Sequence, residues 1–535
     1  MTRRLRPLAW LALLLAPSAY FAWRYRDMPQ FGEWHDDSLY FVAAKSLAAG
    51  SGYRNLSLPG EPYQTKYPPL YPLWLSLVWK INPSFPDNLT LATWFSWIMM
   101  PGFLFGSWLL YRRFGFSEAR AGLLTAMLAV NIYAILFSTR LLSELPFSVL
   151  LLAGLLLCER ALSADRAWQW ALAAGAAGAL ALLTRSAGVA LLVSGFAAFW
   201  GAKRRGHAMI FAAPMVAAFA GWTLWAQLHQ DPASDILSIY HSSYLRYQIL
   251  NIAWSDYPLF VWKNLDQLLY GAGALILPKI TDALPVKILT QTVGIAMIAG
   301  VVRLRGNPGV RRYAGFAVVN AALLLVWHFP PNERFVFPLF PLLLAGLAAE
   351  ISHLAGLLRP ALHHPAREQR IAGWGFAAGL AGLAVAVAGF QAAAMFLYYP
   401  EVMRDHQRRT ARNRAAYRWI AEHVPPAANL LAYNDPTLYL YAHRRACSLT
   451  LPPVYWYHGD HASIRRSFAA ADAFAREHGI EYALVTPSDG HRDMEDSDRL
   501  AALRILARHP AFHLIAKFGD AALYRISRTR SAGPS

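Results

Sequence analysis

The sequence predicts a mostly α-helical, polytopic membrane protein, a bundle of about eleven spanning helices followed by a small extracytoplasmic α/β domain. Of the 535 residues, 56% are hydrophobic and only 15% are charged, whereas roughly a quarter of the residues in a soluble chain are charged. Long apolar runs recur over the first 400 residues and then become shorter. The formal charge of +18 comes mostly from short basic clusters between these runs. Such clusters are typical of the inner loops of membrane proteins and argue against a nucleic-acid partner.

The first apolar run, residues 7–23, lies between arginine-containing flanks. Because no small-residue cleavage site follows it, we expect a retained anchor with the N-terminus in the cytoplasm. A helix needs roughly 20 residues to cross a bilayer, and the further candidate spans have 14 to 28 residues. These candidates are residues 89–111, 119–137, 141–157, 168–183, 187–200, 208–227, 286–302, 314–329, 335–351 and 371–398.

The run at 259–278 is the doubtful case, and the distribution of basic residues decides it. As a full crossing, it would place the basic loops at 303–312 and 359–370 outside the cytoplasm. As a helix that lies at the outer surface or dips into it, it leaves both loops inside, together with the clusters at 112–113 and 203–205. The odd number of spans then puts the C-terminal segment on the opposite side from the N-terminus. Ala- and Arg-rich usage favours a bacterial chain, so we expect the inner membrane and the periplasm.

A long first loop, residues 27–88, carries the densest set of polar and turn-forming residues in the first half of the chain. Asp36 and Asp37 open a predicted helix over 38–49, which a pair of glycines ends. The run at 70–81 is too short to span and rich in Trp and Tyr, so we expect it along the outer interface. Long ordered loops usually have a function, and we expect this loop to contain the catalytic site.

The segment from residue 404 onward has a different pattern. We expect a membrane domain over 1–400, a soluble extracytoplasmic α/β domain over 404–527 and a disordered tail over 528–535. The expected elements are a helix at 412–423, strands at 429–433 and 481–486, and a hairpin formed by 513–518 and 521–526. Position alone suggests that this segment covers the site or selects an acceptor.

The acidic pair at the start of the first-loop helix can cap that helix or perform chemistry. A carboxylate at a helix start accepts hydrogen bonds from the first backbone N–H groups. A carboxylate held at a membrane surface beside apolar and aromatic side chains tends to have a raised pKa, which suits a general base. The two roles can be divided between Asp36 and Asp37.

Several motifs occur in a characteristic order along the chain. In the first loop they are Asp36-Asp37-x-x-Tyr40, Gly50-x-Gly52-Tyr53, Gly60-Glu61-Pro62 and Tyr67-Pro68-Pro69-Leu70. Later ones are Arg140-x-x-x-Glu144, Thr184-Arg185-x-x-Gly188 and Arg334-Phe335-x-x-Pro338-x-x-Pro341. This order resembles the GT-C membrane glycosyltransferases, in particular the bacterial branch of the protein O-mannosyltransferase and aminoarabinose transferase group. That family often has Asp-Glu where this chain has Asp36-Asp37.

The resemblance implies an enzyme that transfers a sugar from a polyprenyl-phosphate donor to a glycan, lipid or protein acceptor, with an acidic residue of the first loop assisting the attack. Two physical arguments support a lipid-linked donor and a single catalytic base. No nucleotide sugar is available outside the cytoplasm, so a lipid must carry the donor there, and the chain has no glycine-rich phosphate loop. A phosphate leaving group is a weak base, so one carboxylate acting as general base suffices for an inverting displacement.

A lipid phosphate at the membrane surface needs cations, and four candidates lie on the expected outer side. They are Arg334, Arg185, Arg140 and Lys66. Each could instead extend from a helix end into the head-group layer. The planar guanidinium group of an arginine can donate two hydrogen bonds to one phosphate. The resemblance makes Arg334 the first choice.

Glu144 lies near the outer end of a span, where an ionisable group is costly unless it is paired or functional. It could form an i, i+4 pair with Arg140, or it could bind the acceptor or a metal. Together with the acidic pair it would suit Mg²⁺ or Mn²⁺, although nothing in the spacing requires a metal. His35 and His328 could serve as ligands or bases, or as polar residues of the interface.

Two further classes of protein compete with the enzyme. A transporter or lipid flippase also has many spans and scattered charges, but it more often places ionisable residues near mid-membrane, in repeated halves. Here these residues gather at the outer ends of the spans, and no repeated half is visible. A non-catalytic membrane scaffold that presents the C-terminal segment is the third possibility. The sequence therefore favours the enzyme.

Overall fold

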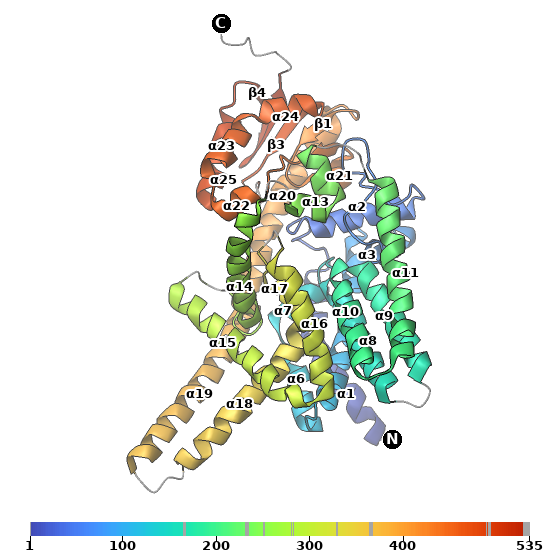
Figure 1. Cartoon of the computed structure of the whole chain (residues 1–535). Coiled ribbons are helices and arrows are strands. Elements are labelled where there is room, and N and C mark those ends of the chain that lie inside the picture. Colours follow the sequence, from blue (N-terminus) through green and yellow to red (C-terminus); the bar gives the residue numbers. More distant parts are fainter. Residues whose placement is uncertain are drawn as a thin grey trace. The chain divides into compact units, whose positions relative to one another are not determined.

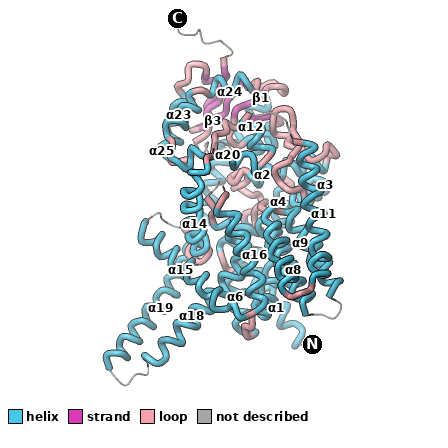
Figure 2. The backbone as a smooth tube through the Cα atoms, viewed as in Figure 1, coloured by secondary structure: helices cyan, strands magenta, loops and turns pink. Residues whose placement is uncertain are grey.

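The computed structural model describes residues 2–163, 167–230, 235–249, 252–279, 281, 283–327, 330–362, 367–487, 489 and 494–527. His328 and the tail at 528–535 lie outside these residues. The described chain is mostly helical, as predicted, and it has a small sheet in the C-terminal segment (Figures 1 and 2).

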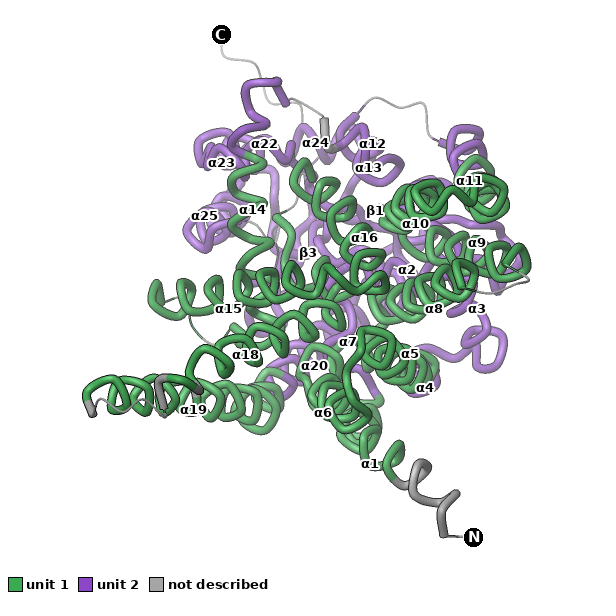
Figure 3. Tube along the Cα trace, turned by 60° about the horizontal axis from the view of Figure 1, so that its bottom comes forward, with its two compact units in different colours: residues 1–26, 93–221, 260–402 green, residues 27–92, 222–259, 403–535 purple. Residues whose placement is uncertain are grey.

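The chain divides into two compact units (Figure 3). Unit 1 contains residues 1–26, 93–221 and 260–402, and unit 2 contains residues 27–92, 222–259 and 403–535. The whole first loop and the C-terminal segment therefore belong to the same unit. The separate domain at 404–527 stays a prediction.

Unit 1 consists of helices. They are α1 (Thr2–Arg24), α5 (Met99–Arg113), α6 (Glu118–Ala129), α7 (Ile132–Ser138), α8 (Glu144–Ser163), α9 (Ala167–Thr184), α10 (Val189–Gly201), α15 (Leu284–Arg303), α16 (Pro308–Leu325), α17 (Glu333–Val336), α18 (Phe340–Leu362) and α19 (Arg367–Ala393). Four helices contain residues of both units: α4 (Leu89–Trp97), α11 (Arg205–His229), α14 (Tyr257–Ala274) and α20 (Tyr399–His423).

Within the described ranges, seven helical stretches are long and apolar enough to cross a membrane, or eight if the bent pair α6 and α7 forms one span. The seven are Leu89–Arg113, Glu144–Ser163, Ala167–Thr184, Arg205–His229, Leu284–Gly306, Glu333–Leu358 and Glu368–His423. The protein is therefore an integral membrane protein with several apolar spans.

This count is lower than the predicted eleven or so, partly because some apolar runs form short or broken helices. Residues 187–200 lie in a 3-10 turn (Ser186–Gly188) and in the 13-residue α10. Residues 119–137 are interrupted at Asn131, whose side chain accepts two backbone N–H groups in the first turn of α7. Helices α6 and α7 consequently meet at an angle of 62°. The doubtful run forms α14, which is not among the seven stretches.

Close packing in unit 1 depends on small residues, as is usual between membrane helices. A Cβ atom added to Gly300 of α15 would lie 1.8 Å from the backbone oxygen of Gly346 in α18. One added to Gly346 would lie 2.2 Å from the backbone oxygen of Met297. Any larger residue at either glycine would push these two helices apart.

The first loop of unit 2 contains two helices. Helix α2 (Asp36–Ala48) begins two residues before its predicted start, so the acidic pair occupies its first turn. Helix α3 (Leu70–Ile81) has the predicted bounds and is an apolar helix of 12 residues, too short to span. Further helices of unit 2 are α12 (Ile236–Ser242), α13 (Tyr244–Ile249), α21 (Asp435–Ala442), α22 (Val454–His458), α23 (His461–Ala469), α24 (Ala471–Glu477) and α25 (Asp496–Ala507).

The C-terminal segment forms a mixed five-stranded sheet in the order β2-β1-β3-β5-β4. Its strands are β1 (Asn429–Leu431), β2 (Arg445–Cys447), β3 (Ile480–Val485), β4 (Phe512–Phe518) and β5 (Ala521–Ile526). Strand β1 pairs in parallel with β2 and β3, whereas β5 pairs antiparallel with β3 and β4. The predicted hairpin is β4–β5, and both other predicted strands are present. The sequence does not predict β2.

Hydrophobic clusters cover both faces of this sheet, because successive strand residues point to opposite sides. Leu484 of β3 belongs to one cluster with Tyr417 of α20. Its neighbour Val485 belongs to the other cluster, with Phe468 of α23. Leu58 of the first loop also belongs to this second cluster. The first loop thus shares a hydrophobic core with the C-terminal segment.

Candidate functional site

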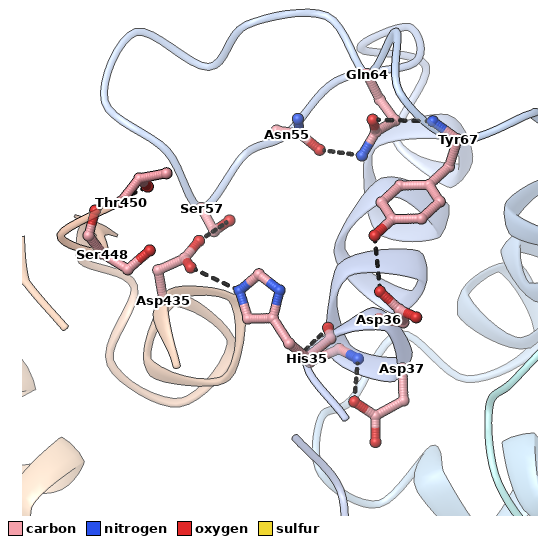
Figure 4. Close-up of polar contacts among 11 residues, drawn as sticks. His35, Asp36, Asp37, Asn55, Ser57, Gln64, Tyr67, Asp435, Ser448 and Thr450 are labelled. Atoms are coloured by element: carbon pink, nitrogen blue, oxygen red, sulfur yellow. Dashed lines mark hydrogen bonds and ion pairs between the residues drawn. The ribbon is translucent and has the colours of Figure 1, made fainter. Parts of the chain in front are cut away.

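The two acids in the first turn of α2 make different contacts (Figure 4). Asp36 is partly exposed, and its Oδ1 accepts a 2.7 Å hydrogen bond from the Tyr67 hydroxyl. Asp37 is 2% exposed, and its carboxylate accepts the backbone N–H groups of Gly32 at 3.0 Å and Ser38 at 2.7 Å. Asp37 therefore satisfies one backbone donor in the first turn of α2 and one in the loop before it. Asp36 keeps a partly exposed carboxylate beside the Tyr67 hydroxyl.

Lys66 lies in the same loop and is buried. Its Nζ is 3.5 Å from the centroid of the Tyr240 ring, a cation–π contact. Burial lowers the pKa of Lys66 to about 7, although the negative charge of Asp36 raises it. Lys66 therefore changes its charge near neutral pH, and the charge of Asp36 influences the pH at which it does so.

A buried histidine accompanies this lysine. His241 of α12 is 5% exposed, and its Nε2 is a buried atom that makes no hydrogen bond to the described residues. Burial is the main cause that lowers the pKa of His241 well below its usual range, and the charges of Lys66 and His35 lower it further. His241 is therefore a neutral imidazole at physiological pH. No local sequence pattern singles out His241, because only the fold brings it close to Lys66 of the first loop.

Unit 1 brings together three of the predicted charged residues. Glu144 is the first residue of α8 and is fully buried. Its Oε1 lies 2.7 Å from both Nε and Nη2 of Arg334 and 2.8 Å from Nη1 of Arg185. One carboxylate therefore joins two guanidinium groups, and the trio carries a net positive charge of about one.

Two further predictions concern Arg140 and a metal site formed by acidic residues. Arg140 is buried in the segment between α7 and α8. Glu144 forms ion pairs with Arg185 and Arg334, and the predicted pair of Glu144 with Arg140 stays a prediction. Across the described ranges, no group of three His, Cys, Asp or Glu residues is arranged to hold a metal ion. A bound Mg²⁺ or Mn²⁺ therefore stays a prediction from the sequence.

His35 precedes the acidic pair, and its ring is held by the C-terminal segment (Figure 4). Its Nε2 lies 3.0 Å from Oδ1 of Asp435, which is the first residue of α21 and is 1% exposed. Ser57 of the first loop donates a 3.0 Å hydrogen bond to the other oxygen of Asp435. Sequence reasoning names His35 but not Asp435, since the tertiary fold alone brings them together.

With this geometry, the chain has the fold of the GT-C membrane glycosyltransferases, which confirms at the level of the fold the resemblance seen in its motifs. It matches the structure of ArnT from Cupriavidus metallidurans bound to undecaprenyl phosphate, with a TM-score of 0.52 at 15% identity over 98% of this chain and 99% of that chain. It also matches the archaeal oligosaccharyltransferase AglB from Archaeoglobus fulgidus in complex with an inhibitory peptide and a dolichol-phosphate. That TM-score is 0.50, at 12% identity over 97% of this chain and 74% of that chain. No protein-family model and no curated protein matches the sequence.

Proposed function

We propose that this protein is an integral-membrane glycosyltransferase, a hexosyl or pentosyl transferase that takes its sugar from a polyprenyl-phosphate-linked donor. The acceptor is a glycan, lipid or protein of the cell envelope, and the transfer takes place on the extracytoplasmic side. Fold likeness alone does not establish an activity. The observation that carries the proposal is the partly exposed carboxylate of Asp36, which lies beside the Tyr67 hydroxyl and influences the pKa of the buried Lys66.

The proposed reaction needs one base. The acceptor hydroxyl gives its proton to Asp36 while its oxygen attacks the anomeric carbon of the donor. The bond from that carbon to the phosphate oxygen breaks, and the polyprenyl phosphate leaves with the electron pair. Attack opposite the leaving group inverts the configuration. The 2.7 Å hydrogen bond from Tyr67 orients the Asp36 carboxylate for this proton transfer.

The proposed donor site uses the predicted cations. Arg334 remains the first choice for the lipid phosphate, with Arg185, Arg140 and Lys66 as further candidates. Glu144 neutralises one of the two guanidinium charges that it contacts. The trio therefore keeps a positive charge that can attract a phosphate without leaving two unpaired charges in a buried place. The two similar structures contain undecaprenyl phosphate and a dolichol-phosphate, which supports a lipid phosphate as the ligand.

The proposed orientation follows from the basic loops. An N-terminus in the cytoplasm and about eleven spans would put the first loop and the C-terminal segment in the periplasm of a bacterial cell. The bent pair α6 and α7 and the helices α1, α10 and α16 would then complete the set of spans. No step of the reaction is assigned to a metal.

A panel of lipid-linked sugars tests the proposal. Purified protein in lipid would receive mannosyl, glucosyl and aminoarabinosyl polyprenyl phosphates together with a cell-envelope extract as the source of acceptor. We expect one donor to be consumed, with release of polyprenyl phosphate and labelling of an acceptor. Movement of the lipid across the bilayer without cleavage of any donor would instead support a transporter.

If Lys66 helps to bind the lipid phosphate, KM for the donor should depend on pH. Because the Lys66 pKa is about 7, the ammonium group is present below that pH and lost above it. We therefore expect KM for the lipid donor to rise as pH increases from about 6 to 8. Lys66→Arg, which stays charged, should remove that rise, and Lys66→Gln should have a high KM at every pH. A wild-type profile that Lys66→Arg reproduces would contradict the assignment and leave the titration to another group.

A further inference from the structure

The backbone at the start of α2 adopts an unusual conformation at His35. Its φ of 59° and ψ of −47° lie outside the regions that a residue with a side chain prefers. Such a residue costs on the order of 1–3 kcal/mol and persists only when its surroundings hold it. The His35 carbonyl accepts hydrogen bonds from the Leu39 backbone N–H and the Ser38 hydroxyl, both at 3.0 Å. His35 therefore sets the direction in which the first turn of α2, and with it Asp36, begins.

The C-terminal segment supplies the group that holds His35. Asp435 is 1% exposed and receives the imidazole Nε2 of His35 on one oxygen and the hydroxyl of Ser57 on the other, both at 3.0 Å. Since a carboxylate accepts, Nε2 carries the proton in this contact. A hydrogen bond to a buried carboxylate is strong and directional. Its two donors fix Asp435, and Asp435 in turn fixes the ring of His35.

A second contact brings α21 against the same backbone. Gly32 has a φ of 90°, and a Cβ added there would lie 2.4 Å from Oγ1 of Thr437. The N–H of Gly32 donates to Asp37 at 3.0 Å. Helix α21 therefore contacts the loop just before α2 through Thr437 and contacts His35 through Asp435.

We infer that Asp435 is a positioning residue of the transferase, which orients the candidate base Asp36 through His35. The C-terminal segment would then take part in positioning the catalytic base, beyond covering the site or selecting the acceptor. This inference rests on the proposed function, because the quantity that Asp435 controls is the rate of sugar transfer. It differs from that function in naming a residue that does not touch the substrate.

The test is a double-mutant cycle with Asp435→Asn and His35→Gln in the full chain. Asn keeps the size of Asp435 and an acceptor for Ser57. We expect each single variant to lower kcat by about 10- to 100-fold with KM for the donor within twofold, since a misplacement of about 1 Å costs that much. The double variant should be no slower than the slower single variant. Arg445→Gln is the matched control, because it breaks the partly exposed Arg445–Glu61 ion pair between the same two segments and should keep kcat within twofold.

Hydrogen exchange provides a readout that does not depend on activity. In Asp435→Asn, amides of residues 35–40 should exchange at least tenfold faster, while the strands β3 and β5 keep wild-type protection. Wild-type kcat together with wild-type exchange in Asp435→Asn would overturn the inference. An inactive wild-type protein would refute the proposed function, and the exchange of residues 35–40 would then decide by itself whether Asp435 positions the loop.

Discussion

Asp36→Asn is expected to lower kcat for sugar transfer by about 10²- to 10⁴-fold, because an amide cannot take the proton of the acceptor hydroxyl. The side chain keeps its size and can still accept the hydrogen bond from Tyr67. The variant should therefore fold and fail in the chemical step, and its KM for the donor at pH 7 should rise only as far as loss of the Asp36 charge lowers the pKa of Lys66. Single-turnover transfer from a radiolabelled donor measures this step directly.

Asp37→Asn is the control that separates the two acids. It disturbs a buried carboxylate that accepts two backbone N–H groups, so we expect a loss of stability of about 1 kcal/mol and a smaller effect on kcat. Tyr67→Phe removes only the hydrogen bond to Asp36 and should reduce kcat less than Asp36→Asn. An Asp36→Asn variant that retains wild-type single-turnover transfer would exclude Asp36 as the base and direct attention to Asp37 or to the neutral His241.

Local sequence patterns predict elements well where one segment determines its own structure. Helix α3 has a clear apolar pattern between Pro69 and Asn82, and the hairpin β4–β5 has one on each side of Gly519-Asp520. Both elements form where these patterns predict them. Breaks inside apolar runs are less visible. The capping side chain of Asn131 divides one predicted span into two helices, and a hydropathy average does not register a single polar residue.

Contacts between distant segments set the limit for predicting the site. The sequence identifies Glu144, Arg185 and Arg334 separately, because a charged side chain near the end of a spanning helix has a free-energy cost unless it is paired or functional. Only the fold shows that the three side chains contact one another. Asp435 gives no such signal. It is one acidic residue in a polar segment, and its importance arises from its burial against His35.

Glu144→Gln should have the largest effect on stability of any single substitution near the candidate donor site. Its carboxylate is fully buried and contacts both Arg185 and Arg334. Removing one partner of a buried ion pair costs about 3–5 kcal/mol, because the remaining charges stay buried and uncompensated. We expect a clear drop in the thermal unfolding midpoint of the purified protein in lipid. A double variant, Glu144→Leu with Arg334→Met, leaves fewer uncompensated charges and should be more stable than Glu144→Gln alone.

Undecaprenyl phosphate distinguishes a structural trio from a donor site. A ligand that binds only the folded state raises its stability in proportion to the logarithm of its concentration relative to Kd. If Arg334 and Arg185 bind the donor phosphate, the lipid supplies a negative charge that Glu144→Gln has lost. The lipid should then raise the unfolding midpoint of Glu144→Gln more than that of the wild-type protein, and it should raise that of Arg334→Met less. Equal shifts in all three proteins would mean that the phosphate binds elsewhere, and the trio would then be a purely structural connection between α8, α17 and the end of α9.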